Sequence, residues 1–255
     1  MTKTSISAAM QHAAGPMSAA RFPSLDGRRV FVTGGGSGIG AAMVEAFAAQ
    51  GALVAFVDVA AEASAALAAR LQARGLRAPW WRACDVRDLA ALQSAIADAG
   101  AALGDFHVLV NNVASDDRHT LESVTPEYWD TRMAINERPA FFAIQAVVPG
   151  MKRLGQGSVI NLGSTGWQTK ASEYPCYAIA KSSANGLTRG LAKSLGAFRI
   201  RINTVSPGWV MTERQVQKWL TPAGEEDIAQ MVLFLAADDG RMCTAQEFKV
   251  DAGWA

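Results

Sequence analysis

Short apolar runs alternate with longer, alanine-rich stretches along most of the chain. The runs are rich in Val, Ile, Leu, Phe or Trp and predict buried strands at residues 29–32, 52–57, 78–84, 106–110, 158–162, 201–205 and 247–250. The stretches between them predict helices at residues 41–49, 61–74, 88–101, 126–153 and 175–195, and a last helix that ends within 232–237. Pro139 predicts a kink or a restart inside the longest of these helices.

This alternation predicts the fold class. Strands that are separated by helices pair in parallel through right-handed crossovers, and the helices then cover both faces of the sheet. We therefore expect an α/β fold, a single-domain Rossmann-type doubly wound parallel sheet of about seven strands flanked by helices. Ligand sites in such sheets gather at the carboxyl ends of the strands, so the residues just after each predicted strand are the first candidates.

A glycine-rich loop follows the first predicted strand. Residues 33–40 have the sequence Thr-Gly-Gly-Gly-Ser-Gly-Ile-Gly and lead directly into the predicted helix at 41–49. Loop glycines let the backbone approach a pyrophosphate, while free N–H groups and the positive end of the helix dipole face its charge. We therefore expect a dinucleotide phosphate here. The same residues also fit a Gly36-x-Gly38-x-x-Ala41 pattern or a plain tight turn.

Asp58 ends the second predicted strand, 18 residues after Gly40. An acid in this place accepts hydrogen bonds from the adenosine ribose and repels the additional phosphate of NADP. No Arg or Lys interrupts the glycine loop to bind such a phosphate. The pattern therefore predicts NAD as the cofactor. The alternative is that Asp58 only forms a turn or caps the following helix.

Composition narrows the function classes. A net charge of +1 and a pI near 7.7 give no reason to expect nucleic acid or an anionic membrane surface as a partner. No apolar run reaches the roughly 20 residues that span a bilayer, and the first residues lack the pattern of a signal peptide. Cys84, Cys176 and Cys243 have no paired spacing, so we expect neither disulfides nor a metal site, and a cytoplasmic location. We expect residues 1–24 to be a disordered extension and residues 25–255 to form the domain.

A set of short motifs occurs in the order and spacing of a known family. The set comprises Thr33-Gly34-x-x-x-Gly38-x-Gly40, Asp85, Asn111-Asn112, Asn136, Ser164, Tyr177-x-x-x-Lys181 and Pro207-Gly208. From about residue 25 to the C-terminus, the chain resembles the short-chain dehydrogenases/reductases. One departure is Val113-Ala114, where that family usually has Ala-Gly.

The resemblance implies an oxidoreductase with roles for particular residues. The implied catalytic residues are Asn136, Ser164, Tyr177 and Lys181. The implied cofactor-binding residues are Gly34, Ser37, Gly38, Ile39, Gly40, Asp58, Asp85, Val86, Asn112, Tyr177, Lys181, Pro207, Gly208, Val210 and Thr212. An alternative role for Thr212 is a helix cap. The resemblance also implies a homotetramer that is built on the helices at 126–153 and 175–195.

Tyr177 and Lys181 are four residues apart and so share one face of the predicted helix. A lysine ammonium favours the phenolate, and lowering a tyrosine pKa from near 10 to neutrality takes about 3 units, or roughly 4 kcal/mol. Lys181 and an oxidised nicotinamide would together supply this, which makes Tyr177 the general base while hydride leaves the same carbon. Alternatives are a surface Tyr–Lys pair, or Tyr174 as the base, although Tyr174 has no lysine four residues later.

By the same resemblance, Ser164 holds the substrate oxygen, Lys181 binds the nicotinamide ribose, and Asn136 holds a water that relays the proton.

Further stretches resemble the bacterial NAD-dependent aldose 1-dehydrogenases of this family, which oxidise the anomeric hydroxyl of a cyclic sugar such as D-xylose to a lactone. They are Asp116-Asp117-Arg118-His119, Gly163-Ser164-x-Gly166-Trp167, Thr212-Glu213-Arg214-Gln215, residues 219–225 and residues 250–254.

A sugar site needs directional polar groups and an aromatic face. We therefore expect the sugar to bind against Ser164, Trp167, Tyr177 and Trp209. Between Gly224 and Ile228 the chain looks shorter than its relatives, which usually carry part of a substrate lid there. A shortened lid would leave the pocket more open to water.

Two other functions stay open. One is a reductase of a ketone or a 3-oxoacyl thioester that uses NAD(P)H, and the other is a non-catalytic sensor that binds NAD. Asp58 argues against the reductase, because relatives with that role usually favour NADPH. The presence of the whole set Asn136, Ser164, Tyr177 and Lys181 argues against the sensor.

Overall fold

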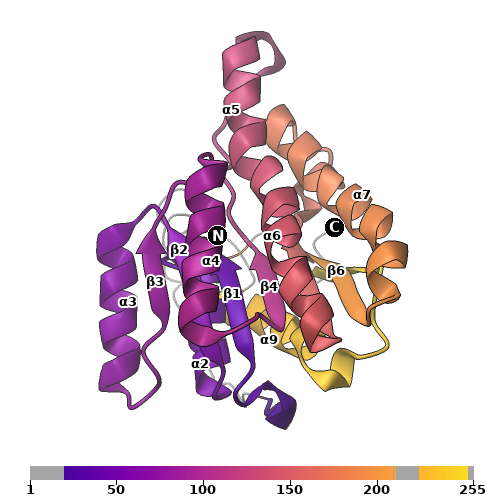
Figure 1. The fold of residues 1–255 in the computed structure, drawn as a ribbon. Coiled ribbons are helices and arrows are strands. Elements are labelled where there is room, and N and C mark those ends of the chain that lie inside the picture. Colours follow the sequence, from indigo (N-terminus) through magenta and orange to yellow (C-terminus); the bar gives the residue numbers. More distant parts are fainter. Residues whose placement is uncertain (1–19, 209, 211–223, 252–255) are drawn as a thin grey trace, which may run out of the picture.

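The computed structural model describes residues 20–208, 210 and 224–251. Seven strands form one parallel sheet in the order β3-β2-β1-β4-β5-β6-β7 (Figure 1). They are β1 (Arg29–Thr33), β2 (Leu53–Asp58), β3 (Trp80–Ala83), β4 (Val108–Asn111), β5 (Gly157–Leu162), β6 (Ile200–Pro207) and β7 (Glu247–Val250). The predicted fold class is confirmed.

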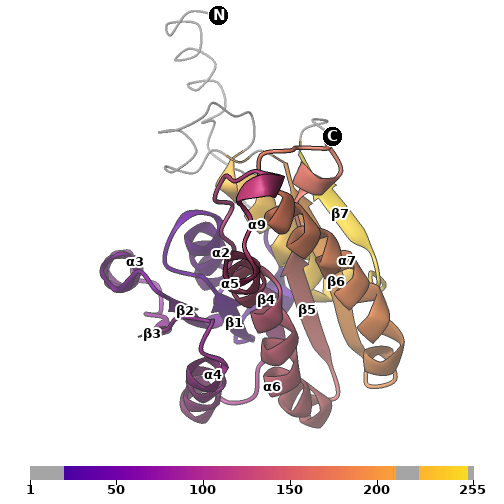
Figure 2. The ribbon, with the colours of Figure 1, turned by 90° about the horizontal axis from the view of Figure 1, so that it is seen from above.

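Helices cover both faces of this sheet, as Figure 2 shows. The helices α2 (Gly38–Ala49), α3 (Ala61–Ala73) and α9 (Glu225–Ala236) pack on one face. The helices α4 (Leu89–Leu103), α6 (Arg138–Leu154) and α7 (Pro175–Gly196) pack on the other. The helix α5 (Pro126–Asn136) precedes α6 and projects beyond the sheet in Figure 1. Short 3₁₀ turns lie at Pro23–Leu25, Leu121–Ser123, Thr165–Trp167 and Asp238–Gly240.

The continuous apolar runs result from this double cover. In β1, Val30 and Val32 face the core beneath α2, whereas Phe31 between them faces the core beneath α4 and α6. Side chains of a strand alternate between the faces of a sheet, so a strand with two covered faces needs apolar residues at every position. All three side chains are fully buried.

The boundaries of several elements differ from the prediction. Helix α2 begins at Gly38, not at residue 41, because the Ala41 N–H donates to the Ser37 carbonyl at 3.1 Å and closes the first turn inside the glycine loop. Strand β3 is shorter than 78–84. Helix α4 begins one residue late, because the Asp88 side chain accepts from the Ala91 N–H at 3.0 Å and acts as the cap. The restart predicted near Pro139 is confirmed, since α5 ends at Asn136 and α6 begins at Arg138.

The N-terminal extension predicted for residues 1–24 lies mostly outside the described residues and stays a prediction. Within residues 20–24, the Phe22 N–H donates to Gln50 Oε1 at 2.9 Å. The Gln50 amide in turn donates to the Ala20 carbonyl at 2.8 Å. These two bonds join the segment to the end of α2.

The strand order places a crevice at the centre of the sheet. The chain runs outward from β1 through β2 to β3, and then returns to β4 on the other side of β1. The loops after β1 and β4 therefore diverge to opposite faces, and such a switch point is where doubly wound sheets bind ligands. The glycine loop and Asn111-Asn112 are these two loops.

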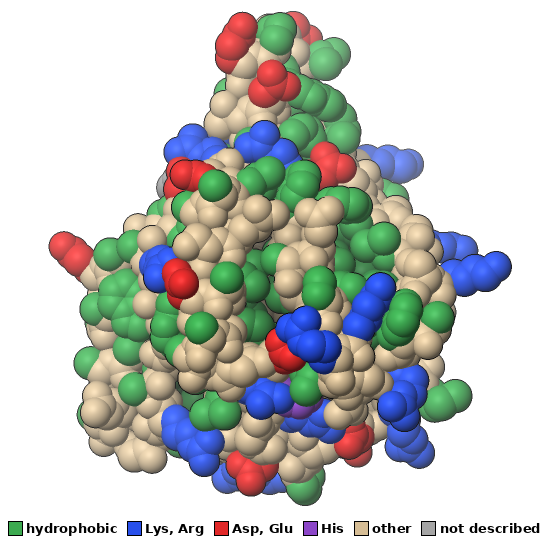
Figure 3. Space-filling view, viewed as in Figure 1, with side chains coloured by type: hydrophobic (Ala, Val, Ile, Leu, Met, Phe, Trp, Pro, Cys, Tyr) green, Lys and Arg blue, Asp and Glu red, His purple; other side chains and the backbone are tan. Residues whose placement is uncertain are grey.

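The surface carries mixed charges, with hydrophobic side chains between them over α5, α6 and α7 (Figure 3). Trp129, Phe141 and Ile179 from these helices are 38%, 46% and 47% exposed. Within the described ranges, no helix is both long and apolar enough to cross a membrane. No cluster of potential metal ligands occurs among those same residues either.

Candidate active site

The glycine turn is held at close range by the neighbouring strands. The N–H groups of Gly34 and Gly35 donate to the Val57 carbonyl at 2.7 and 3.2 Å. The Asn112 amide donates to the Gly34 carbonyl at 2.8 Å. A Cβ added to Gly40 would lie 1.8 Å from that same carbonyl, so only glycine allows α2 to start this close to β1.

The first turn of α2 presents backbone N–H groups to the crevice. Ser37 is the N-cap but makes no side-chain cap bond. The N–H groups at the start of the helix therefore remain available to an anion, and the helix dipole adds to the attraction. The cofactor-binding role of Ser37, Gly38 and Ile39 stays a prediction.

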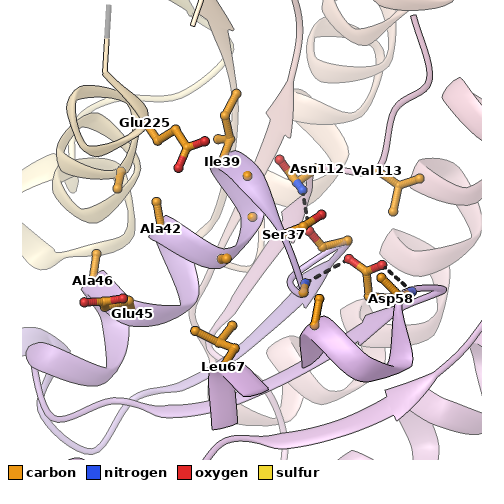
Figure 4. A pocket seen from close by; sticks show the side chains of 18 of the residues that line it. Ser37, Ile39, Ala42, Glu45, Ala46, Asp58, Leu67, Asn112, Val113 and Glu225 are labelled. Carbon is orange, nitrogen blue, oxygen red and sulfur yellow. Dashed lines mark hydrogen bonds between the residues drawn. The ribbon is translucent and has the colours of Figure 1, made fainter. Parts of the chain in front are cut away.

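Asp58 lies directly beneath the glycine turn and is 8% exposed. Its Oδ2 accepts from the Gly36 N–H at 2.8 Å and its Oδ1 accepts from the Ala60 N–H at 2.9 Å. In Figure 4, Asp58 and Asn112 both point towards the turn that carries Ser37. Asp58 therefore has a structural role in the turn, in addition to the role predicted for it.

A cavity of about 1130 Å³ extends from this turn. Its walls include all five glycine-loop residues predicted to bind cofactor, together with Asp58, Val86 and Asn112. Asp85 does not line it, and its carboxylate instead pairs with the Arg87 guanidinium at 2.5 Å. Glu225, from the start of α9, lies beside Ile39 at the rim and was not predicted (Figure 4). The size, the glycine cradle and the buried acid fit a dinucleotide.

A second cavity of about 640 Å³ adjoins the first and is lined by three of the four predicted catalytic residues, Ser164, Tyr177 and Lys181. Pro207 at the end of β6 and Gly208 and Val210 after it also line this cavity, which we call the catalytic cavity. Ile39, Asn112 and Tyr177 line both cavities, which places the tyrosine at their junction.

Tyr177 and Ser164 line the same cavity, so the first turn of α7 and the segment after β5 meet there. Burial raises the pKa of the Tyr177 phenol above its ordinary value, while the Ser164 hydroxyl acts in the opposite direction. Desolvation is the larger of these two effects on the phenol. The lowering predicted from Lys181 together with an oxidised nicotinamide stays a prediction.

Lys181 is nearly inaccessible, at 4% exposure. Its ammonium donates to the Leu162 carbonyl at 2.7 Å and lies 5.9 Å from the centre of the Tyr177 ring. Burial lowers the pKa of Lys181 to about 8. The lysine therefore lies on the same side of α7 as Tyr177, as the four-residue spacing predicts.

Asn136 is the last residue of α5 and is held by the loop after β4. Its Oδ1 accepts from the Ser115 N–H at 2.7 Å, and its Nδ2 donates to the Ser115 carbonyl at 3.1 Å. Asn136 and Lys181 both line a third cavity of about 440 Å³. The break between α5 and α6 thus places Asn136, the predicted water-holding residue, in a cavity that Lys181 also lines.

Two of the predicted substrate residues are not placed in the catalytic cavity. Trp167 does not line it, and the indole Nε1 has no hydrogen-bond partner among the described residues. Trp209 and Thr212 lie outside the described residues. The walls of the cavity also carry three polar candidates for a sugar site, Glu173 and, from the stretch at 116–119, Asp116 and Arg118.

A buried polar chain, which sequence reasoning missed, holds α7 against the sheet. Asn111 Nδ2 donates to Asn161 Oδ1 at 2.9 Å, and Asn161 Nδ2 donates to Thr188 Oγ1 at 3.0 Å. The Thr188 and Thr204 hydroxyls lie 2.8 Å apart. Polar residues inside otherwise apolar strands were the available signal for this chain of bonds.

A dinucleotide crevice that opens onto a serine, a tyrosine and a buried lysine defines an oxidoreductase that works with a nucleotide cofactor. A family profile described as enoyl-(acyl carrier protein) reductase matches residues 34–255. The chain belongs to the short-chain dehydrogenase/reductase family. It is an enzyme that binds a nicotinamide cofactor and acts on a small molecule.

Named relatives are similar over most of the chain. A D-xylose 1-dehydrogenase of Caulobacter vibrioides is 46% identical over 253 residues, which cover 93% of this chain and 100% of that protein. A probable galactose dehydrogenase of Rhizobium meliloti is 46% identical over 251 residues, with 91% and 97% covered. A crystal structure of a 3-oxoacyl-(acyl-carrier protein) reductase with bound NAD from Brucella melitensis has a TM-score of 0.84 at 31% identity, with 94% and 95% covered.

Proposed function

We propose that the protein is an NAD-dependent aldose dehydrogenase that oxidises the anomeric carbon of a cyclic sugar, D-xylose-like, to a lactone. The observation that carries this proposal is the position of Tyr177 at the junction of the dinucleotide crevice and a polar cavity that Ser164 and Lys181 also line. The names of the relatives, a D-xylose 1-dehydrogenase and a probable galactose dehydrogenase, support a sugar as the substrate.

Four residues have separate roles in the proposed reaction. Ser164 holds the substrate oxygen by a hydrogen bond, and Tyr177 accepts the hydroxyl proton. Lys181 binds the nicotinamide ribose, and its ammonium favours the phenolate form of Tyr177. Asn136 holds the water that carries the proton away. Bound NAD supplies the hydride acceptor and a positive charge beside the phenol.

The polar walls of the catalytic cavity suit a polyhydroxylated substrate. Asp116 and Glu173 offer acceptors for sugar hydroxyls, and Arg118 offers donors. Tyr174 adds an aromatic ring to the same wall. A contact of Trp167 or Trp209 with the substrate stays a prediction.

NAD is proposed over NADP because of the surroundings of the Asp58 carboxylate. The residues that follow it, Val59 and Ala60, offer no positive charge to a ribose phosphate. Arg70 and Arg74, which also line the crevice, are ion-paired to Glu45. A phosphate on the ribose would therefore meet a buried acid, and these two arginines are already paired.

The test is an absorbance assay of reduced cofactor with a panel of pentoses and hexoses, each with NAD and with NADP. We expect turnover with at least one aldose and a preference for NAD, and the Tyr177→Phe variant is the control for enzyme-derived signal. Turnover of ketones with NADPH alone would instead support a reductase. Cofactor binding without turnover of either class would support a sensor.

We further propose a homotetramer that is built on α5, α6 and α7, whose exposed Trp129, Phe141 and Ile179 support an interface there. A cytoplasmic site of action is proposed because Cys84, Cys176 and Cys243 are free thiols. Nucleic acid and membrane are not proposed as partners.

A further inference from the structure

The imidazole of His119 joins the loop after β4 to the first turn of α7. Its Nε2 accepts from the Cys176 N–H at 3.1 Å, and Cys176 directly precedes Tyr177. The backbone N–H of His119 also donates to the Glu173 carbonyl at 2.9 Å. We propose that His119 is a positioning residue, which caps the helix that carries Tyr177 and so keeps the phenol at Ser164.

Helix α7 has no local cap for its first turn. The first N–H groups of a helix lack intrahelical partners, and a Ser, Thr, Asp or Asn at the N-cap usually accepts from them. The N-cap of α7 is Tyr174, which makes no side-chain cap bond, and Pro175 has no N–H. Cys176 therefore carries the first N–H of the helix, and its partner is supplied from a distant loop by His119.

The imidazole is itself oriented by α5. Its Nδ1 lies 2.8 Å from the Asp117 carbonyl oxygen and 3.0 Å from the Tyr128 hydroxyl. Since Nε2 accepts a hydrogen bond, the neutral ring carries its proton on Nδ1, which donates to Asp117. The Tyr128 ring packs edge-on at 4.9 Å, and Arg132 binds the Asp117 carboxylate at 2.7 Å. Three residues from one helix and one loop thus determine where Nε2 points.

The two segments that His119 joins both line the catalytic cavity. Asp116 and Arg118 come from the loop, and Tyr174 and Tyr177 come from the start of α7. The Arg118 guanidinium stacks on the Tyr174 ring at 4.4 Å, and that ring meets the Tyr177 ring edge-on at 5.2 Å. A loosened cap would let Tyr177 move relative to Ser164, and a misplacement of about 1 Å costs roughly 100-fold in rate.

The test compares the wild-type chain with His119→Leu and His119→Gln. The inference rests on Tyr177 as the base but not on the sugar, so the assay uses whichever alcohol the wild-type chain oxidises. We expect His119→Leu to lower kcat by about 10- to 100-fold, while the Kd for NAD changes by less than about twofold. The Gln side chain restores an acceptor near the position of Nε2, so His119→Gln should recover most of kcat.

His107→Leu is the matched control. His107 also accepts a backbone N–H, from Arg29 to Nδ1 at 3.2 Å, but it lies at the opposite end of the sheet. This variant should lower the Tm without changing kcat per folded enzyme. A second readout needs no substrate: amide hydrogen exchange of the peptide that contains Cys176 should accelerate in His119→Leu and not in His119→Gln.

Three outcomes would overturn the inference. One is an unchanged kcat in a folded His119→Leu, and another is a rise in KM alone, which would make His119 a substrate contact. The third is exchange at Cys176 that does not respond to the substitution. If the wild-type chain oxidises no alcohol, the proposed function fails, while the exchange measurement still decides the role of His119.

Discussion

Tyr177 and Tyr174 lie one helical turn apart at the start of α7, and their rings are in edge-on contact. Both phenols have a raised pKa, because burial disfavours the charged form of each. They differ in their surroundings: the Ser164 hydroxyl acts to lower the pKa of Tyr177, whereas the Arg118 guanidinium stacks on the ring of Tyr174. These surroundings distinguish the predicted base from its neighbour.

We expect Tyr177→Phe to lower kcat by about 10²- to 10⁴-fold, the usual contribution of a general base. The Kd for NAD should stay nearly unchanged, because the phenol acts on the reacting hydroxyl. Steady-state kinetics and cofactor titration measure both quantities. Tyr174→Phe is the control and should retain most of the activity; a reversed order of the two variants would reassign the base.

The burial of Lys181 predicts how the free energy of unfolding depends on pH. Its pKa falls from 10.5 to about 8 on folding, so the folded state binds fewer protons than the unfolded state between these values. The free energy of unfolding therefore carries a cost of about 3 kcal/mol below pH 8, which is relieved as the pH rises from 8 to 10.5.

Lys181→Met removes this titration. The difference in unfolding free energy between this variant and the wild type, measured by urea denaturation at pH 7, 9 and 10, should shift by about 2 kcal/mol in favour of the wild type as the pH rises. Lys193→Met, at an exposed position of α7, controls for the loss of a lysine from this helix. A difference that does not vary with pH for Lys181→Met would contradict the burial effect.

At the scale of elements, the end of β2 and the start of α2 act as one unit. Asp58 closes the strand and accepts a hydrogen bond from the Gly36 N–H, so its carboxylate shapes the glycine turn. The same carboxylate is the one proposed to bind the ribose. Asp58→Ala should therefore lose stability by about 1–2 kcal/mol and reduce the preference for NAD over NADP about tenfold or more.

Asp58→Asn separates the two effects of that carboxylate. The amide keeps the shape and one acceptor oxygen but has no charge and turns its NH2 group towards the second backbone N–H, so part of the stability should return while the cofactor preference stays reduced. The ratio of kcat/KM for the two cofactors, together with thermal unfolding, checks both statements. An unchanged ratio in both variants would refute the proposed ribose role.

The two glycines Gly40 and Gly186 should respond to alanine in opposite directions. A Cβ at Gly40 meets the Gly34 carbonyl at 1.8 Å, so Gly40→Ala should displace α2 and lower the unfolding free energy by about 2 kcal/mol or more, with loss of NAD affinity. A Cβ at Gly186 in α7 meets nothing within 4 Å, so Gly186→Ala should add about 0.5–1 kcal/mol. Denaturant unfolding measures both, and a stabilised Gly40→Ala would contradict the close approach.

At the scale of the whole molecule, the sheet has one hydrophobic core on each face, and two adjoining cavities lie at the carboxyl ends of its strands. The dinucleotide crevice and the catalytic cavity meet at Tyr177 because the chain switches direction between β1 and β4. The helices that frame the catalytic side, α5 to α7, also carry the exposed apolar side chains. A subunit interface on this face would pack against α5 and α7, the helices that carry Asn136, Tyr177 and Lys181.

We expect light scattering after size exclusion to give about four times the chain mass of 27.0 kDa. Phe141→Glu and Ile179→Glu place charges on side chains that are 46% and 47% exposed, and each should shift the mass towards smaller species. Phe198→Glu, at a 42% exposed position after α7, is the control. A monomeric wild-type protein would contradict the proposed tetramer.

Local patterns in the chain were sufficient for the fold class, the glycine turn and the shared face of Tyr177 and Lys181. These features depend on hydrophobic alternation and on fixed helical spacing, both of which are properties of neighbouring residues. The start of α2 at Gly38 was missed, because a hydrogen bond inside the loop extends the helix and glycine has a low intrinsic preference for it.

What the sequence by itself determined is therefore the order of strands and helices, the acid at the end of β2 and the chemical identity of the catalytic side chains. Only the tertiary structure decided that His119 caps α7, that Trp167 stays off the walls of the catalytic cavity and that burial raises the Tyr177 pKa. The reason is physical: capping across 57 residues and desolvation both depend on which distant segments pack together, and no local spacing encodes those contacts.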